Sequence, residues 1–315
     1  MDFSRIDSVI DIERMQCVEI TVFGAGGSAG LTNSLVRSGA RRFNLFDPDC
    51  VTSSNIARQA HDAEFLETPK VEALAAALYR TNPDVDVRRF VRDITTMTDA
   101  EIDEAAGASD LLINATDSFR ASARGNEIAL RLGIPALWVG LYPKGLAGEV
   151  IWWTPQIDAC HRCLCAKRYA AHEQAAATGR SLDPSSDGCT IFDITLLDSI
   201  AGMIAVSLLT QGANNRFGCL IQQLNDRNFI QVQIDPSWNF NGRNPIRELL
   251  GVASDSPAFF AWNTIVRSDP DRGQLPCPDC ERFRGHRFVR EGDVTRRIKP
   301  DDLPTVGAIG GGDVA

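Results

Sequence analysis

Short apolar runs alternate with amphipathic stretches through the first half of the chain. The apolar runs, whose length predicts strands, lie at residues 19–23, 42–46, 85–90, 111–114 and 136–140. Stretches that predict helices lie at residues 28–38, 68–82 and 118–132. The second helix shows the spacing most clearly, because Val71, Leu74, Ala75 and Leu78 share one helical face. This alternation predicts an α/β fold with a Rossmann-like, doubly wound, mostly parallel sheet.

The second half of the chain breaks this rhythm. Strands are expected at residues 150–153 and 229–234, with a mostly apolar helix at 194–211 between them. A polar stretch rich in turn-forming residues, 178–188, predicts a loop. We therefore expect antiparallel strands to extend the parallel sheet.

Charge narrows the classes of partner. The chain has 315 residues, with 41 acidic and 32 basic side chains and a net charge of −9. An acidic surface repels phosphate backbones, which disfavours bulk nucleic-acid binding. The first residues show no basic segment before an apolar run, and the apolar stretch 194–209 contains Asp198 and is shorter than the roughly 20 residues of a membrane span. We therefore expect a cytoplasmic protein without membrane association, whose nine cysteines are metal ligands or reactive thiols.

A glycine-rich turn separates the first expected strand from the first expected helix. Gly24, Gly26, Gly27 and Gly30 permit close approach of a phosphate, which the helix N-terminus then stabilises. Asp47 closes the next strand, where a carboxylate can bind ribose hydroxyls. NAD, FAD and ATP all fit these residues, and a tight turn without a ligand is the alternative interpretation.

Side chains beyond this turn favour a triphosphate. Lys70 lies in the first turn of an expected helix, where the dipole disfavours a cation but a nearby phosphate would recruit one. Asp117 follows a strand, at the edge of the sheet where a Mg²⁺–phosphate ligand belongs. Taken singly, Asp117 fits a helix N-cap and Arg58 fits a surface arginine.

Two CxxC pairs predict a metal centre. Cys160 and Cys163 form one pair, and Cys277 and Cys280 form the other. Each pair supplies two thiolates from one turn, and four thiolates complete a structural Zn²⁺ site with no open position. His161 and Cys165 lie close enough to compete as ligands, but the CxxC spacing favours the four cysteines.

Cys189 follows the expected loop and precedes a helix. A thiol at a helix N-terminus gains nucleophilicity, so Cys189 is a candidate nucleophile, with a buried, inert cysteine as the alternative. Cys17, Cys50 and Cys219 lie in apolar sequence, and we expect them in the core.

Together these residues resemble the ThiF/MoeB/HesA family, the bacterial relatives of ubiquitin-activating enzymes. The resemblance covers nearly the whole chain and rests on GAGGSAG, Asp47, Asp49, NIARQ, PKVEA, NATDSFRASARGN and both CxxC pairs. It implies ATP-dependent adenylation of a carboxylate, usually the C-terminal glycine of a small β-grasp protein of the ubiquitin-like or sulfur-carrier kind. It further implies Asp47 on the ribose, Asp117 on Mg²⁺, and Cys189 at the place of a nucleophilic cysteine on a crossover loop.

The resemblance also implies a set of binding residues and a homodimer. The implied cofactor-binding residues are Gly24, Gly26, Gly27, Asp47, Asp49, Asn55, Arg58, Gln59, Lys70, Asp117 and Arg5. Among them, Arg58, Gln59 and Lys70 would bind the triphosphate. Arg5, or else Arg14, would reach the partner's ATP, and Arg58, Asp117 and Cys189 would be catalytic. A downstream conjugating or sulfur-transfer protein is a further implied partner.

Departures from the family pattern bear on the substrate. Ser118 stands where Asn is commoner, and the loop before Cys189 does not show the small-residue motif of sulfur-carrier activators. These departures favour as partner a ubiquitin-like protein that is not a sulfur carrier. Adenylation of a modified tRNA nucleoside and an NAD- or FAD-dependent oxidoreductase are the alternatives, as is a non-catalytic scaffold.

These motifs divide the chain into four segments. We expect a nucleotide-binding (adenylation) domain at 1–165, a crossover loop with the candidate cysteine at 166–195, a part that completes the sheet and zinc site at 196–305, and a disordered tail at 306–315.

Overall fold

Eight strands form one sheet in the order β3-β2-β1-β4-β5-β6-β7-β8. The computed structural model describes residues 1–183, 188–239, 242–251, 263–268, 270, 277–284, 287–291 and 294–298, so the tail predicted at 306–315 lies outside the described residues. The five parallel strands are β1 (Glu19–Phe23), β2 (Arg42–Phe46), β3 (Asp86–Phe90), β4 (Leu111–Asn114) and β5 (Ala136–Leu141). Antiparallel strands extend them, namely β6 (Ala147–Trp153), β7 (Phe229–Gln233) and β8 (Asn263–Arg267). The predicted fold class is confirmed.

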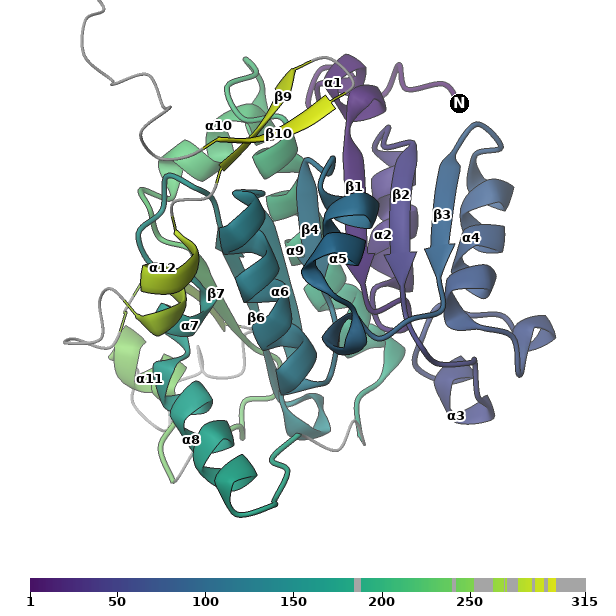
Figure 1. The fold of residues 1–315 in the computed structure, drawn as a ribbon. Coiled ribbons are helices and arrows are strands. Elements are labelled where there is room, and N and C mark those ends of the chain that lie inside the picture. Colours follow the sequence, from purple (N-terminus) through teal and green to yellow (C-terminus); the bar gives the residue numbers. More distant parts are fainter. Residues whose placement is uncertain are drawn as a thin grey trace, which may run out of the picture.

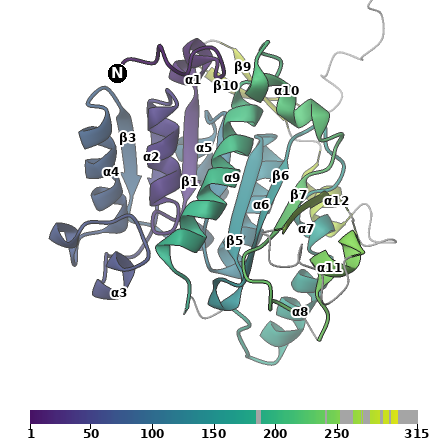
Figure 2. The same cartoon turned by 180° about the vertical axis from the view of Figure 1, so that it is seen from behind.

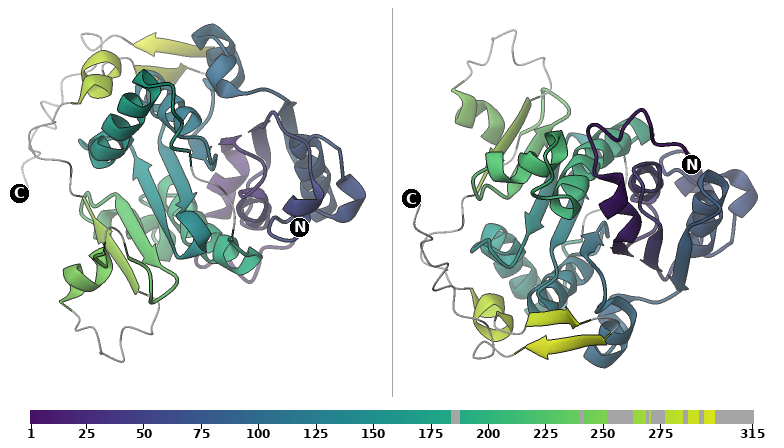
Figure 3. Two further views of the ribbon diagram at one scale, coloured as in Figure 1. Left: turned by 90° about the horizontal axis from the view of Figure 1, so that it is seen from below. Right: turned by 90° about the horizontal axis from the view of Figure 1, so that it is seen from above.

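Helices cover both faces of this sheet. One layer contains α2 (Ala29–Arg37), α4 (Lys70–Thr81) and α9 (Ile191–Leu209), which lie in front in Figure 2. The other contains α5 (Asp99–Ala106) and α6 (Phe119–Leu132), in front in Figure 1. Figure 3 looks along the strands and shows the sheet between the two layers.

Shorter elements complete the described part of the chain. The remaining α-helices are α1 (Ile12–Cys17), α3 (Ser53–Ile56), α7 (His161–Leu164), α8 (Ala166–Ala177), α10 (Arg216–Gln223), α11 (Pro245–Leu250) and α12 (Pro278–Phe283). The 3₁₀ turns are η1 (Ala63–Phe65), η2 (Ile94–Thr96) and η3 (Pro143–Gly145). A separate hairpin pairs β9 (Arg287–Glu291) with β10 (Val294–Ile298).

Each strand and helix expected from the sequence is present. The largest differences are at β6, which starts at Ala147 instead of 150, and at α9, which starts at Ile191 instead of 194. Thr190 starts α9 earlier because its side chain accepts the Asp193 N–H while the Asp193 carboxylate accepts the Thr190 N–H.

The apolar helix α9 packs with one side on a face of the sheet. Its length and composition would allow it to cross a membrane. In this structure it lies against α2, β5 and β6, with Ile204, Ala205 and Leu209 buried. These contacts account for the apolar residues on its buried side, whereas Phe192 is exposed.

The strand order positions the candidate site. From β1 the chain proceeds to β2 and β3 on one side, while β4 and β5 lie on the other. The turns after β1 and β4 therefore diverge to opposite faces at adjacent strand ends. Doubly wound sheets bind ligands in the crevice at such a point, outside the carboxyl ends of the strands.

Candidate functional site

The glycine-rich turn joins β1 to α2 at the carboxyl edge of the sheet. The Gly24 N–H donates to the Phe46 carbonyl over 2.8 Å, and Gly24 has a φ of +95°. A Cβ at residue 24 would lie 2.6 Å from the Ala115 carbonyl oxygen. Glycine is therefore needed here both for the backbone conformation and for contact with the neighbouring strand ends.

Gly27 lines the cavity at this edge for a different reason. A Cβ at Gly27 would meet no described atom within 4 Å, so packing within the protein does not require glycine there. The side chain of Gln59 lies against Gly26, and its Oε1 atom is buried without a hydrogen-bond partner among the described residues. An open position on the turn and an unsatisfied buried oxygen both fit a polar ligand.

Asp47 connects the glycine turn to Lys70. Its Oδ2 accepts the Ala25 N–H over 2.8 Å, and its Oδ1 accepts the Asp49 N–H over 2.9 Å. The Lys70 Nζ lies 2.8 Å from Asp49 Oδ2 and 3.9 Å from Asp47 Oδ1. Burial raises the pKa of Asp47, and the Lys70 ammonium opposes that rise. The two carboxylates hold a cation at the start of α4, where the helix dipole alone disfavours it.

Asp117 lies between β4 and α6 with an exposed side chain. The N-cap of α6 is Ser118, whose hydroxyl accepts the Ala121 N–H, so capping does not use Asp117. From the segment after α8, Asp183 Oδ1 accepts the Phe119 N–H over 2.8 Å. The capping interpretation of Asp117 is therefore wrong, and its carboxylate lines the cavity.

One cavity of about 600 Å³ collects most of the predicted site residues. Those that line it are Gly24, Gly26, Gly27, Asp47, Asp49, Arg58, Gln59, Lys70, Asp117 and Cys189. A volume of this order is typical of a small-molecule or cofactor site. Together with the glycine turn, the cations and the carboxylates, it fits a nucleotide with its phosphates.

Two predicted residues lie outside this lining. Asn55 is buried, and its Oδ1 accepts the Thr52 N–H over 3.0 Å in a capping box that starts α3. Arg5 is exposed in the amino-terminal segment, which Figure 1 shows at the end of the sheet opposite α3. Arg14, the alternative to Arg5, donates to the Gln211 carbonyl over 2.9 Å.

Cys189 is half-buried in the cavity wall, immediately before α9. Its Sγ lies 3.4 Å from Arg58 Nη1. On its other side, a Cβ at Gly145 would lie 3.3 Å from the Cys189 Cα, and Gly145 has a φ of +65°. The thiol is thus seated between η3 and Arg58, at the N-terminal end of a long helix.

Asp198 is a cavity residue that no sequence motif indicated. It is 8 % exposed, and its Oδ2 accepts the Leu31 N–H over 3.0 Å in the first turn of α2. Burial raises its pKa to about 7. The sequence feature that could have indicated Asp198 as a site residue is its position as an acidic residue inside the apolar run 194–209.

An ion pair between a half-buried arginine and a buried glutamate forms another part of the wall. The Arg168 guanidinium donates to both carboxylate oxygens of Glu149, and the Tyr142 hydroxyl donates to Glu149 Oε2 over 2.6 Å. Although burial opposes ionisation, the Arg168 charge keeps the pKa of Glu149 below its ordinary value. The pair attaches α8 to β6 beside the cavity.

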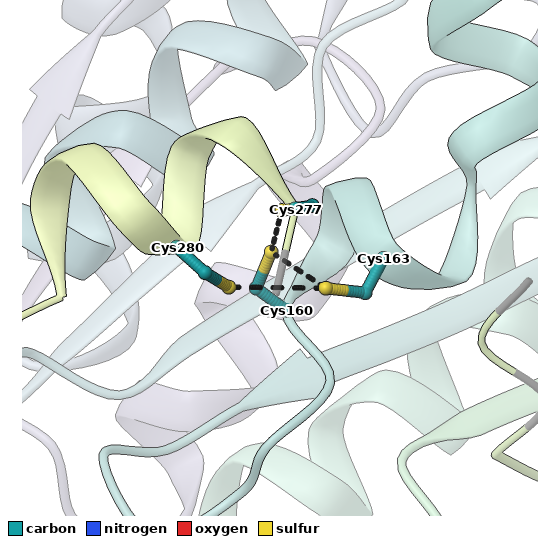
Figure 4. Close-up of side chains that lie close together, drawn as sticks. All are labelled: Cys160, Cys163, Cys277 and Cys280. Carbon is teal, nitrogen blue, oxygen red and sulfur yellow. Dashed lines mark hydrogen bonds between the residues drawn. The ribbon is translucent and has the colours of Figure 1, made fainter. Parts of the chain in front are cut away.

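The four predicted metal ligands, which come from the starts of α7 and α12, meet in one cluster (Figure 4). Cys160 Sγ lies 3.7 Å from Cys163 Sγ and 3.6 Å from Cys277 Sγ, and Cys163 Sγ lies 3.8 Å from Cys280 Sγ. Four sulfurs at 2.3 Å from one zinc ion in a tetrahedron are about 3.8 Å apart. The cluster therefore fits a closed, structural Zn²⁺ site.

Hydrogen bonds from α6 and α7 surround this cluster. The Asn126 amide donates to Asp279 Oδ2 over 2.8 Å and lies 3.7 Å from Cys160 Sγ, and Arg162 donates to Asp279 Oδ1 over 3.0 Å. His161 shares a hydrogen bond with the Tyr169 hydroxyl and lies outside the four-sulfur group. The four cysteines that the sequence favours over His161 and Cys165 thus lie together, with their sulfurs within 4.8 Å of one another.

The prediction for the other cysteines is wrong. Cys17 and Cys50 are exposed, and Cys219 is half-buried. Cys17 ends α1, and Cys50 follows β2 in an isolated β-bridge with Pro69. Next to them Val18 and Val51 are buried, while the two cysteines are exposed.

The fold and the cavity define a Rossmann-like nucleotide-binding protein with a four-cysteine cluster that fits a metal ion. The ThiF family model matches residues 2–232, so the chain belongs to the ThiF family. Bombyx mori ubiquitin-like modifier-activating enzyme 5 is 28% identical over 172 residues, 52% of this chain and 44% of that protein. Haloferax volcanii SAMP-activating enzyme E1 is 29% identical over 153 residues, 48% of this chain and 54% of that protein. The chain spans about half the length of these relatives.

Solved structures share the fold. Escherichia coli MccB, solved with succinimide, has a TM-score of 0.58 at 14% identity over 85% of this chain and 67% of that chain. PaaA has a TM-score of 0.55 at 19% identity over 70% of this chain and 71% of that one. MccB has also been solved with ATP, at a TM-score of 0.51 and 15% identity over 62% of this chain and 57% of that chain.

Proposed function

We propose that this chain uses ATP to adenylate the C-terminal glycine carboxylate of a small ubiquitin-like or sulfur-carrier protein. The observation that carries the proposal is that the glycine turn, Asp47, Arg58, Lys70 and Asp117 line one cavity at the carboxyl edge of the sheet. Relatives named for activating a ubiquitin-like modifier or SAMP support this class of substrate. The acidic surface favours it over a tRNA substrate.

The reaction joins the carboxylate to the α-phosphorus of ATP and expels pyrophosphate. A carboxylate oxygen forms the new O–P bond in line with the bond to the leaving group, whose electron pair departs with pyrophosphate. Positioning and charge stabilisation supply most of the rate in such a transfer. Asp47 would bind the ribose, and Arg58 and Lys70 would stabilise the charge that develops on the phosphates.

Mg²⁺ fits Asp117. The exposed carboxylate of Asp117 offers the oxygen ligands that Mg²⁺ prefers, at the edge where the phosphates would lie. When bound, the ion would neutralise phosphate charge.

Cys189 would take the acyl group in a second step. Its sulfur lines the same cavity and precedes the N-terminus of α9, which favours a thiolate. Attack on the acyl adenylate would form a thioester and release AMP. A downstream protein would then accept the carrier from Cys189.

Arg5 fits a site shared between two copies of the chain. It does not line the cavity of its own chain. A symmetric homodimer would let each amino-terminal segment reach the partner's nucleotide. We expect such a dimer in the cytoplasm.

Pyrophosphate–ATP exchange tests the proposal. The chain should catalyse exchange only when a cognate carrier with a C-terminal glycine is present. Asp117→Ala should abolish it, while Asp84→Ala, which changes an exposed aspartate in the turn between α4 and β3, should retain it. Tight binding of NAD together with no binding of ATP would contradict the proposal.

A further inference from the structure

Arg58 and Cys189, which have different roles in the proposed function, are in direct contact in the cavity wall. Arg58 follows α3 and binds phosphates in the proposed function, whereas Cys189 precedes α9 and takes the acyl group there; both line the cavity. Their side chains meet with Nη1 and Sγ 3.4 Å apart. A guanidinium cannot deprotonate, so it donates a charge-assisted hydrogen bond to a thiolate.

The backbone around Cys189 holds its thiol next to the Arg58 guanidinium. A Cβ at Gly188 would lie 3.2 Å from the Lys144 Cα, and one at Gly145 would lie 2.8 Å from Asp193 Oδ2. Both glycines have positive φ, +83° for Gly188 and +65° for Gly145. The segment before α9 thus lies directly on η3, which sets the thiol at the cavity wall facing Arg58.

We propose that Arg58 is a positioning and activating residue for the Cys189 thiol, and that nucleotide phosphates and the thiol compete for its single guanidinium. The proposal rests on the proposed function and adds an order of events to it. While a triphosphate occupies the cavity, Arg58 turns to the phosphates and the thiol lacks its cation. Once pyrophosphate has left, Arg58 returns to Cys189.

The step that this order controls is the attack of Cys189 on the acyl adenylate. The Cys189 thiol gives its proton to solvent, and Arg58 stabilises the thiolate. The sulfur attacks the carbonyl carbon of the acyl adenylate, a C–S bond forms, and the C–O bond to AMP breaks. The electron pair of that bond leaves with AMP, and no oxidation or reduction takes place. Competition for Arg58 delays this attack until adenylation is complete.

Alkylation of Cys189 by iodoacetamide, resolved by peptide mass spectrometry on the full zinc-loaded chain, tests the proposal without any carrier. Exposed Cys17 provides an internal reference rate. Arg58→Ala should slow alkylation of Cys189 by about fivefold or more, the effect of losing one charge-assisted hydrogen bond, and Arg58→Lys should recover part of the rate. Arg92→Ala is the matched control, because Arg92 also lines the cavity but pairs with Glu101, and it should alkylate at the wild-type rate.

Nucleotides provide the second arm of the same experiment. Saturating ATP should slow alkylation of the wild-type Cys189, whereas AMP, which lacks the β- and γ-phosphates, should slow it much less. An unchanged or faster rate in Arg58→Ala, or equal slowing by ATP and AMP, would overturn the proposal. Exchange activity is measured separately: its absence with normal alkylation results would count against adenylation alone, and its presence with a failed alkylation test would count against the role of Arg58 alone.

Discussion

The cavity and the cysteine cluster are both built from distant segments, but they differ in what their side chains face. In the cluster, four sulfurs face one another, and Asn126 and Arg162 donate hydrogen bonds to Asp279 beside them. In the cavity, Arg58, Lys70 and Asp117 line a volume of about 600 Å³ instead of meeting one another. The cluster therefore fits a structural role, and the cavity fits a bound ligand.

The cysteine cluster and the cavity also differ in how their acidic groups are neutralised. The Cys160 thiol donates a hydrogen bond to Cys163 Sγ, which favours the protonated form of Cys160 and raises its pKa. A bound metal ion would displace that proton and stabilise all four sulfurs as thiolates. The carboxylates of the cavity instead pair with Lys70, a side chain that can exchange its partner for a phosphate.

Removal of the metal should have the largest effect. Cys163→Ser should lose Zn²⁺ and lower the free energy of unfolding by about 5 kcal/mol or more, because metal binding joins α7 to α12 only in the folded state. Metal analysis and urea unfolding measure the two effects. Cys165→Ser removes a buried cysteine outside the cluster and is the matched control, which should keep its zinc. A zinc-free wild-type chain of full stability would contradict the structural role of the cluster.

Asp198→Asn should raise the free energy of unfolding relative to the wild type at neutral and higher pH, because it removes a buried carboxylate. Burial raises the pKa of Asp198 to about 7 from its ordinary 3.8, so the folded state binds the proton more tightly than the unfolded state. Asp198 therefore destabilises the fold increasingly as pH rises from about 4 through 7. The stability advantage of Asp198→Asn over the wild type should grow by about 3 kcal/mol between pH 5 and pH 8. Urea unfolding at both pH values measures it, and parallel pH profiles would contradict it.

Lys70→Met should affect the reaction and leave the fold intact. It removes a cation from the expected phosphate site and should lower pyrophosphate exchange by about 100-fold, or about 2.7 kcal/mol of barrier. Circular dichroism should show an unchanged melting transition to within a few degrees. Arg89→Ala, which removes an exposed cation paired with Glu72, should keep wild-type exchange. Equal losses in both variants would point to a general charge effect instead of a phosphate contact.

The sequence predicted the cavity well because its residues follow strands whose carboxyl ends must meet. Gly24 and Asp47 come directly after a strand and Asp117 comes shortly after one, so a parallel sheet places them at one edge. Spacing alone predicted that the four cysteines lie together, yet it could not show that Asn126 on α6 donates to Asp279 beside them. That contact joins residues 153 positions apart and depends on how α12 packs on α6.

Single residues inside regular elements were harder to interpret. Asp198 lies in an apolar helix, and no local pattern shows that it faces the glycine turn. The Glu149–Arg168 pair was missed for the same reason, since a strand and a helix bring its members together. Cys17 and Cys50 were misplaced because apolar sequence neighbours do not fix the direction of one side chain at the end of an element.

Mixing two inactive variants gives the smallest expected signal and tests whether the cavity, unlike the cluster, is completed by a second chain. Arg5→Ala and Asp117→Ala should each lose exchange when tested alone. In a mixed sample, half of the dimers would combine the two chains, and one of the two sites in each would carry neither defect. Exchange should therefore recover to about a quarter of the wild-type level. Normal dimers with no recovery would exclude a shared Arg5, and the same mixture with Arg14→Ala would then identify which amino-terminal arginine, if either, crosses to the partner.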